Sequence, residues 1–279
     1  MIRRVLCALS LLFLAGCVQQ GPREPTAEEK ARHAEIQRLF SEGCKRSGEF
    51  IRRTASNVEG IMLLKLRPAH FSPYDKNAID PYGYDFDWSY DDKPPPYIGT
   101  FLVGKDEKGH FQETKPIVSP GYRYVEAIDP KDGKRYRYTG AIRDVTHTSS
   151  ILIGGDGKTK FVTRDFVVDK ELASGTPARY GVSFDDITTK EERDYWIAGS
   201  SLKVIDLQTN ELIAERIGYM IDFAQGATPG GRQPWTFARK NRGWSCPPLN
   251  LQNYGARRFV EKVLLIRDAQ PTSQQDAAR

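Results

Sequence analysis

Residues 195–222 contain the pattern that most constrains the fold of this chain. Leu202, Val204 and Asp206 alternate with Lys203, Ile205 and Leu207, a turn follows at 208–210, and the chain returns as a second strand from Leu212 to Met220. Alternation on both sides of a short polar turn is typical of a β-hairpin. Lys203 is the only charged residue between Leu202 and Ile205, so we expect both faces of this hairpin to be covered. The pattern predicts a central hairpin with helices or a second sheet packed on it.

Six more segments have the composition and period of β-strands. They are Tyr97–Val103, Tyr122–Ile128, Tyr136–Ile142, Ser150–Ile153, Phe161–Val168 and Arg179–Phe184. The dipeptide Asp132-Gly133 is predicted to join the second to the third, and the glycine-rich turn 154–157 the fourth to the fifth. Short turns between consecutive strands imply an antiparallel sheet. A further run, Ile61–Leu66, is predicted as a buried strand.

Helical patterns lie near the two ends of the chain. Thr26 and Glu29 form a predicted capping box, which is followed by apolar residues at helical spacing as far as Gly43. A second helical piece is predicted from Phe50 to Val58, and a terminal helix from Tyr254 to Leu264. These elements predict an α+β fold, mostly an antiparallel sheet with the N-terminal and C-terminal helices packed on it.

Composition limits the size of the folded body and the kinds of partner that it can bind. The chain has 279 residues, of which 39% are hydrophobic, which is sufficient for a single domain predicted over 26–268. The formal charge is +5, and loss of Arg3 and Arg4 with a leader lowers the basic count from 41 to 39 against 36 acidic residues, or +3. A balance this close to neutral argues against nucleic acid as a partner.

The first residues have the order of a bacterial export signal. Arg3 and Arg4 precede the apolar run Val5–Ala15, which is too short to span a bilayer and matches the apolar part of a signal peptide. The run ends in Leu14-Ala15-Gly16-Cys17, which resembles the lipobox of bacterial lipoproteins. The resemblance covers only this end of the chain and says nothing about the fold of the body.

The lipobox resemblance implies an anchor and an address. It implies that residues 1–16 are removed and that Cys17 receives a lipid, leaving the polar residues 17–25 as a flexible tether. Because position 18 is Val and not the Asp associated with inner-membrane retention, it also implies attachment to the outer membrane. We expect the body to lie in the periplasm, with membrane contact through the lipid, and 269–279 to form a polar tail.

Two cysteines remain for the body once Cys17 carries a lipid. Cys44 and Cys246 are predicted to form a disulfide, because the compartment is oxidising and no other partner is near either one. The bond would close a loop of about 200 residues, worth on the order of 4 to 5 kcal/mol in the chain-entropy model. Two buried free thiols, or a redox pair, are the alternatives.

An aromatic and acidic loop at 82–92 is the first candidate binding segment. It contains Tyr84, Asp85, Asp87, Trp88, Tyr90, Asp91 and Asp92. Carboxylates at alternate positions suit a hard cation such as calcium, and aromatic rings suit sugar stacking. The sugar-stacking function would make the protein a binder or hydrolase of cell-wall glycan. The ligand order of a known calcium loop is incomplete, which favours a solvated loop whose aromatic residues pack on the domain.

A second candidate segment is the basic loop at 225–248. In this loop, cationic side chains are interleaved with indole rings, and Arg232 and Trp235 are the candidate contact residues. Such a pattern suits an anionic polymer, a lipid headgroup or an acidic patch on a partner. The alternative is a long connection whose tryptophans are held on the core beside Cys246. This structural interpretation is the favoured one.

The sequence contains no recognisable catalytic or cofactor motif. The four histidines fit no zinc spacing, the hydrolase motif G-x-S-x-G is missing, and the glycines at 154–157 lack the residues of a phosphate-binding loop. We therefore expect no metal, no cofactor and a non-enzymatic role. The leading hypothesis is an anchored envelope lipoprotein that acts through protein contacts as a structural or assembly component.

Overall fold

The computed structural model describes residues 24–68, 71–84, 96–105, 111–112, 119–151, 154–249 and 255–267. The chain divides into two compact units, residues 1–38 and 39–279. Helix α1, Ala27–Arg46, begins in the first and ends in the second. At its start the predicted capping box is present, because the Thr26 amide donates to Glu29 Oε2 at 2.7 Å and the Glu29 amide to Thr26 Oγ1 at 3.2 Å.

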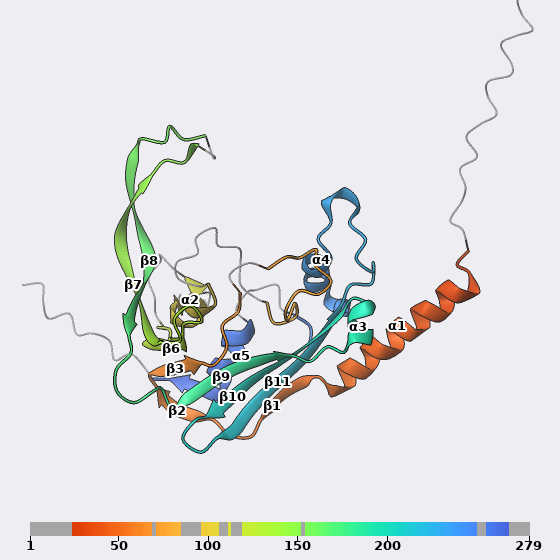
Figure 1. Ribbon diagram of the computed structural model, residues 1–279, viewed down its shortest axis with the longest axis horizontal. Helices are drawn as coiled ribbons and strands as arrows, with labels where there is room; N and C mark the ends of the chain where they lie inside the picture. The colour runs from red at the N-terminus through yellow and green to blue at the C-terminus, as the bar shows by residue number, and fades with distance from the viewer. Residues whose placement is uncertain are drawn as a thin grey trace, which may run out of the picture. The chain divides into compact units, whose positions relative to one another are not determined.

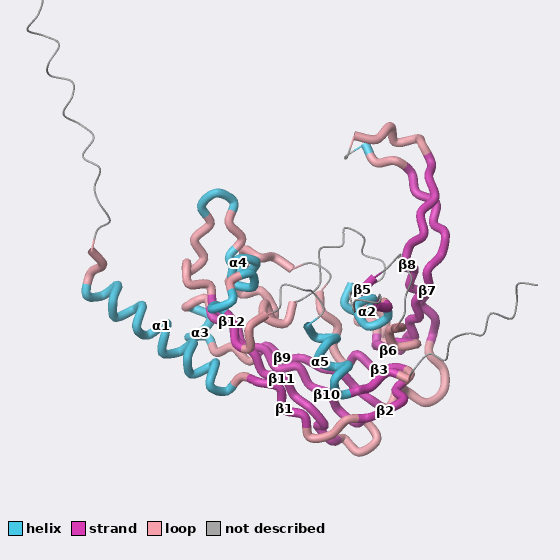
Figure 2. The backbone as a smooth tube through the Cα atoms, turned by 180° about the vertical axis from the view of Figure 1, so that it is seen from behind, coloured by secondary structure: helices cyan, strands magenta, loops and turns pink. Residues whose placement is uncertain are grey.

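The second unit is α+β, as predicted, and is built on one nine-stranded sheet (Figures 1 and 2). Its strands lie in the order β1-β11-β10-β9-β3-β6-β7-β8, and β12 also pairs with β11. The strand bounds are β1 Gly48–Ile51, β3 Gly60–Leu63, β6 Tyr124–Ile128, β7 Arg135–Thr148, β8 Lys160–Leu172, β9 Tyr180–Asp186, β10 Ile197–Asp206, β11 Glu211–Ile221 and β12 Ser245–Cys246. All these ladders are antiparallel except the two made by β3, which is parallel to β6 and β9.

Short strands and helices complete the unit. Strand β2, Ala55–Val58, pairs with β13, Leu264–Ile266, and β4, Gly104–Lys105, pairs with β5, Phe111–Gln112. The helices are α2 Pro96–Leu102, α3 Lys190–Asp194, α4 Pro234–Lys240 and α5 Gly255–Val263, with 3-10 turns η2 Pro229–Gly231 and η3 Arg242–Trp244.

The predicted central hairpin is confirmed as β10 and β11. Every residue from 197 to 202 is buried, which accords with the expectation that both of its faces are covered. The main core lies between the sheet and helices α2 and α5, and Leu202, Val204, Phe101 and Phe259 belong to this one buried cluster. A smaller cluster places Trp235 of α4 against Met220 at the end of β11.

The predicted helix at Phe50–Val58 is wrong, because this segment forms strands β1 and β2 with a bend between them. β1 finds hydrogen-bond partners on β11, and β2 finds them on β13. Asn57 has φ of 58°, which an α-helix does not accommodate. Tertiary pairing has overridden the three- and four-residue spacing of the apolar side chains.

The predicted strand at Tyr97–Val103 is also wrong, because the segment forms helix α2. Tyr97, Ile98, Phe101 and Leu102 are buried, and positions 97, 98, 101 and 102 share one face of a helix. The preceding residue, Pro96, is the first residue of α2, where its fixed φ favours helix formation. A short apolar run is compatible with both the strand period and the helix period, and packing against the core favours the helix here.

Two predicted strands, Tyr136–Ile142 and Ser150–Ile153, need correction together. β7 continues to Thr148, whereas Ser150 and Ile151 lie in the following turn and residues 152–153 lie outside the described ones. The glycine-rich turn at 154–157 therefore joins β7 to β8. Strand β3 also ends at Leu63, three residues before the predicted end at Leu66, and the terminal helix ends at Val263.

Candidate functional site

The aromatic and acidic loop is described only at its start. Tyr84 is buried and its ring stacks on Phe71, with the centroids 4.2 Å apart and an interplanar angle of 19°. Asp85, Asp87 and Trp88 lie outside the described residues. Tyr84 therefore packs on the domain, as expected for an aromatic residue without a binding role. Glycan binding by Asp85, Asp87 and Trp88 stays a prediction.

The two residues singled out in the basic loop have intramolecular partners. Arg232 Nη1 donates to Asp222 Oδ2 at 3.0 Å, and the indole nitrogen of Trp235 donates to the Asp75 carbonyl at 2.7 Å. Trp235 is fully buried in the small core cluster. Both contacts match the interpretation in which this connection is held on the core.

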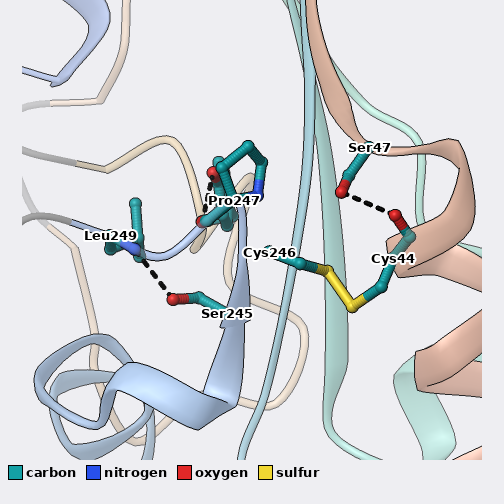
Figure 3. The surroundings of a disulfide bond; sticks show 7 residues. Cys44, Ser47, Ser245, Cys246, Pro247 and Leu249 are labelled. Carbon is teal, nitrogen blue, oxygen red and sulfur yellow. Dashed lines mark hydrogen bonds between the residues drawn. A yellow bond between two sulfur atoms is a disulfide. The ribbon is translucent and has the colours of Figure 1, made fainter.

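The predicted disulfide is confirmed, and it fastens the last turns of α1 to β12 (Figure 3). The Cα atoms of Cys44 and Cys246 are 5.4 Å apart, within the range that a disulfide requires. On the helix side, Gly43 lies directly against the ring of Tyr219 in β11, where a larger side chain would clash. Cys17, the predicted lipidation site, lies outside the described residues.

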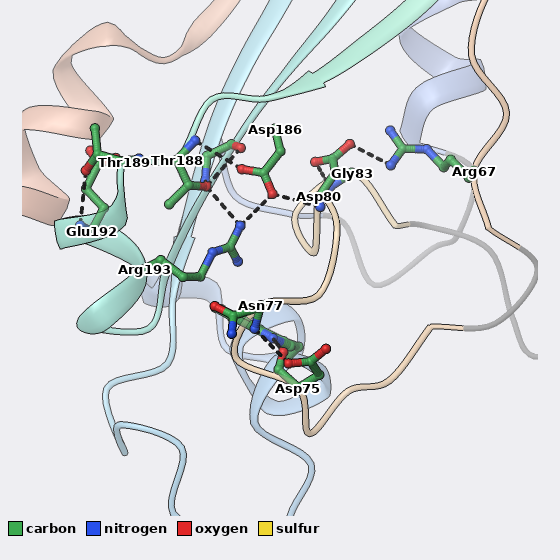
Figure 4. Close-up of polar contacts among 12 residues, drawn as sticks. Arg67, Asp75, Asn77, Asp80, Gly83, Asp186, Thr188, Thr189, Glu192 and Arg193 are labelled. Atoms are coloured by element: carbon green, nitrogen blue, oxygen red, sulfur yellow. Dashed lines mark hydrogen bonds and ion pairs between the residues drawn. The ribbon is translucent and has the colours of Figure 1, made fainter.

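A polar network joins the loop at 71–84 to the end of β9 and the start of α3 (Figure 4). Asp186 Oδ2 accepts from Arg193 Nη2 at 2.5 Å and from the Asp80 amide at 2.9 Å. Asp80 is fully buried and pairs with Arg67 Nη1 at 2.6 Å. Burial raises the pKa of the Asp80 carboxyl, against the opposing effect of Arg67. The network fixes a loop that has little regular structure of its own.

A long two-stranded projection is the most unusual feature of the unit (Figures 1 and 2). β6 pairs with β7 only at 135–138, whereas β8 pairs with β7 along its whole length to Thr148. We call residues 139–151 and 154–169 the arm. No residue of the arm is fully buried, although the strands below it contribute to the core.

Polar contacts shape the arm and its turn. Arg143 Nη1 donates to Asp169 Oδ1 at 3.0 Å, and the His147 ring nitrogen lies 2.5 Å from Asp165 Oδ2. At the turn, Ser149 and Thr159 donate hydrogen bonds to the Asp156 carboxylate, which hold its pKa well below its ordinary value. These contacts keep the two strands in register out to the turn.

Three apolar side chains near the turn face solvent. Ile151 is 74% exposed, Val162 63% and Phe161 47%. The Phe161 ring is partly covered by His147, with the centroids 5.5 Å apart and an interplanar angle of 24°. We call Ile151, Phe161 and Val162 the apolar tip. Phe161 and Val162 are consecutive in β8 and therefore point to opposite faces of the ribbon, so apolar surface is exposed on both of its faces near the turn. Exposed apolar residues at the end of a projection are typical of a contact surface.

The charges of the arm are balanced. Its basic residues are Arg143, Lys158, Lys160 and Arg164, and its acidic residues are Asp144, Asp156, Asp165 and Asp169. β8 is also the last strand of the sheet order, so its outer edge has no strand partner among the described residues. Balanced charge together with an apolar tip suits a protein surface better than a polyanion.

The described residues contain neither a cluster of metal ligands nor a membrane-spanning helix. No group of three or more His, Cys, Asp or Glu side chains within them is arranged to hold a metal ion. No helix in that part of the chain combines the length and the apolar composition needed to cross a membrane. A sequence signal for the arm is present in the β-branched residues Val145, Thr146 and Thr148 beyond Ile142, but it does not reveal how far the ribbon projects.

Comparisons with family models, curated proteins and solved structures found no match to this chain.

Proposed function

We propose that this protein is a lipid-anchored component of a bacterial envelope, and that it acts through protein contacts made by the arm. In this proposal Cys17 carries the lipid, the outer membrane holds the anchor, and the body lies in the periplasm as a structural or assembly component. The lipobox-like sequence before Cys17 supports the anchor. The disulfide between Cys44 and Cys246 supports an oxidising compartment.

The exposure of the arm is the observation that carries the contact role. A two-stranded hairpin without a covering layer is marginally stable in water, because it buries little apolar surface. Here such a hairpin carries three exposed apolar side chains at its end. A partner that covers Ile151, Phe161 and Val162 would remove this surface from water, and one that pairs with β8 would satisfy its outer edge.

Site-specific photocrosslinking in intact cells tests the contact role. A photoreactive residue at Val162 should give a discrete adduct with an envelope protein. The matched control is Ile79, which is 61% exposed against 63% for Val162 but lies outside the arm. An adduct from Ile79 and none from Val162 would contradict the assignment of the arm.

The anchor is tested separately by Cys17→Ser. This variant should leave the membrane fraction, because its lipid attachment atom is lost, whereas Cys44→Ser should stay bound. Sedimentation after a salt wash measures the difference. Retention of Cys17→Ser on membranes would contradict the anchor and would leave the contact role of the arm untouched.

A further inference from the structure

The large sheet ends in two edge strands, and β8 is the longer of them. β8 has 13 residues, whereas β1, at the other end of the strand order, has 4. The ladder between β7 and β8 has no register shift, and β8 contains neither Pro nor Gly. A long, regular edge strand without a proline or a bulge is a template for pairing with another strand.

The hydrogen bonds at the two ends of the β7–β8 ladder show which backbone groups of β8 face outward. The Ser149 amide donates to the Thr159 carbonyl at 2.8 Å, and the Ala173 amide donates to the Arg135 carbonyl at 3.0 Å. Both pairs continue the register of the ladder, in which hydrogen-bonded pairs alternate with non-hydrogen-bonded pairs. Odd-numbered residues of β8 therefore bond to β7. Even-numbered residues from 160 to 172 direct their amides and carbonyls away from it, where no strand of the described residues pairs with them.

The charged side chains of β8 are divided between its two faces. Side chains at even and odd positions of a strand point to opposite faces. The basic residues are all even-numbered, namely Lys160, Arg164 and Lys170, and the acidic residues are all odd-numbered, namely Asp165, Asp169 and Glu171. We call the face with the even-numbered side chains the basic face of β8. Its residues are the same ones whose backbone groups point outward.

The basic face has little compensating charge near the turn. Arg164 Nε lies 3.6 Å from Asp144 Oδ1, and both side chains are 72% exposed, so this pair is weak. Lys160 is exposed, lies opposite the uncharged Thr148, and forms no ion pair with any carboxylate of the described residues. Val162 lies between the two cations and is 63% exposed. An added strand would therefore meet a cation, an apolar side chain and a second cation at alternate positions.

A second copy of this chain fits this edge poorly. Two identical strands that pair antiparallel about a two-fold axis keep each side chain on its own face, so even positions lie opposite even positions. In every register the basic residues of β8 would then lie opposite basic or uncharged residues, and the acidic ones opposite acidic or uncharged residues. Like charges directly opposite each other are destabilising, and no register gains a pair of opposite charges. The division of charge acts against self-pairing and favours a strand of different composition.

We propose that the outer edge of β8 binds an extended segment of a partner protein as an added antiparallel strand. The segment has carboxylates opposite Lys160 and Arg164 and an apolar side chain opposite Val162. Main-chain hydrogen bonds to the even-numbered residues supply affinity, and the pairs on the basic face supply specificity. The antiparallel sense continues the β6–β7 and β7–β8 ladders. This inference rests on the contact role of the arm and specifies the chemistry of its partner.

A synthetic peptide, Val-Thr-Glu-Thr-Val-Thr-Glu-Thr-Val, provides the probe. Its two glutamates and central valine match Lys160, Val162 and Arg164 on one face of an added strand. Fluorescence anisotropy of the labelled peptide, titrated with the full chain in detergent, should show saturable binding. The same peptide with lysine in place of both glutamates should bind roughly five-fold more weakly or worse, because like charges then lie opposite each other.

N-methylation of the peptide tests the main-chain hydrogen bonds without any change in the protein. In the proposed register the amide of the central valine donates to β8, so N-methylation of that valine should abolish binding. The amide of the threonine beside it points away from β8. N-methylation of this threonine is the matched control and should leave the affinity unchanged.

Charge exchange tests the side-chain pairs. Lys160→Glu combined with Arg164→Glu should weaken binding of the acidic peptide roughly five-fold or more and should strengthen binding of the lysine peptide. The matched control is Lys131→Glu combined with Lys134→Glu, which changes the net charge equally at two exposed positions outside the arm. This control should bind both peptides as the wild type does.

Three results would overturn the inference. They are no saturable binding of the acidic peptide up to about 1 mM, equal affinity for the acidic and lysine peptides, and equal loss from the two N-methylated peptides. Each is distinct from a failure of the contact role, which the photocrosslinking at Val162 measures. An adduct at Val162 without peptide binding would leave the arm as a contact surface and would remove its edge as a strand-binding site.

Discussion

The two longest strand pairs of the sheet, β7–β8 and β10–β11, are both antiparallel ladders. They differ in how much of their surface is buried. β7 and β8 have 14 and 13 residues, and β10 and β11 have 10 and 11. In the shorter pair, Leu202, Val204 and Ile213 are completely buried. In the longer one, no residue of the arm is fully buried.

The difference shows that strand pairing and stability are separate properties. Each buried aliphatic side chain of the central hairpin contributes about 1.5–3 kcal/mol relative to an exposed one. An exposed ion pair such as Arg143 with Asp169 contributes little to stability, because water and salt screen it. Apolar burial therefore stabilises the central hairpin, whereas the arm is held mostly by the hydrogen bonds between β7 and β8 and by the contacts of its turn. The four predictions below challenge this contrast, from the largest expected effect to the smallest.

Removal of the disulfide should have the largest effect, and it should fall on the body. Cys44→Ala frees a loop of 202 residues, so we expect a loss of about 5 kcal/mol in the free energy of unfolding under non-reducing conditions. Denaturant titration measures the loss. Cys246→Ala should lose as much, and the double variant no more than either. Free thiols in the unreduced wild type would contradict the bond.

The same side chain should matter in one hairpin and not in the other. Val204→Ala removes completely buried methyl groups from β10, and we expect a loss of about 2–4 kcal/mol. Val162→Ala, at a position 63% exposed, should change the free energy of unfolding by no more than about 0.5 kcal/mol. Equal losses from the two variants would mean that the arm is part of the cooperative core.

Acid should weaken the central hairpin through Asp206. Hydrogen bonds from Arg179 and Arg53 lower the pKa of this buried carboxylate well below its ordinary value. A depressed pKa contributes stability that is fully present above the unfolded value of about 3.9 and is lost as the pH falls toward the folded value. Asp206→Asn should cost about 1–3 kcal/mol at pH 7 and flatten the loss of stability below pH about 4.

A matched change on the arm provides the control for the acid experiment. Asp169 is also paired with an arginine, which lowers its pKa, but its side chain is 46% exposed. Asp169→Asn should therefore leave the global pH profile of unfolding unchanged within error. A profile that shifts as much with Asp169→Asn as with Asp206→Asn would contradict the division between the two hairpins.

Arg143→Gln should have the smallest effect, confined to the arm. It breaks the exposed pair with Asp169, so the global free energy of unfolding should stay within the error of the measurement. Amide hydrogen exchange should increase near Ala141 and Val167, a directly paired position, and not in β10. Arg123→Gln, 79% exposed and outside the arm, should leave exchange in the arm unchanged.

The features predicted from sequence are those with a local or covalent cause. The alternation around Leu202 and the turn at 208–210 identify the β10–β11 hairpin without any knowledge of its neighbours. If the predicted leader is removed and Cys17 carries a lipid, Cys44 and Cys246 are the two cysteines left, so their bond could be predicted from composition alone. These predictions needed no information about how distant segments pack.

The errors arose where packing selects between two patterns. The segment at 50–58 has helical spacing, yet its backbone pairs with β11 and β13. For β7 the sequence predicts two separate strands before the turn, because Ser150–Ile153 resembles a strand of its own, whereas β7 is one strand, Arg135–Thr148. Only the register with β8 shows that β7 is continuous to Thr148.

The candidate contact surface could be foreseen only in part. Ile151, Phe161 and Val162 belong to segments predicted as strands, and alternation alone does not show which of their faces is covered. Their exposure follows from the projection of the arm, which only the fold shows.

The disulfide also determines how mechanical load would pass through the body. A force applied at the amino-terminal end reaches Cys44 before it reaches β1. Without the bond, that force would unzip β1 from β11 one hydrogen-bonded pair after another. With it, two covalent routes share the load, one through β1 and one through Cys246 in β12, and both strands are anchored on β11. Pulling from the amino-terminal end would therefore have to break two attachments to β11 and not one.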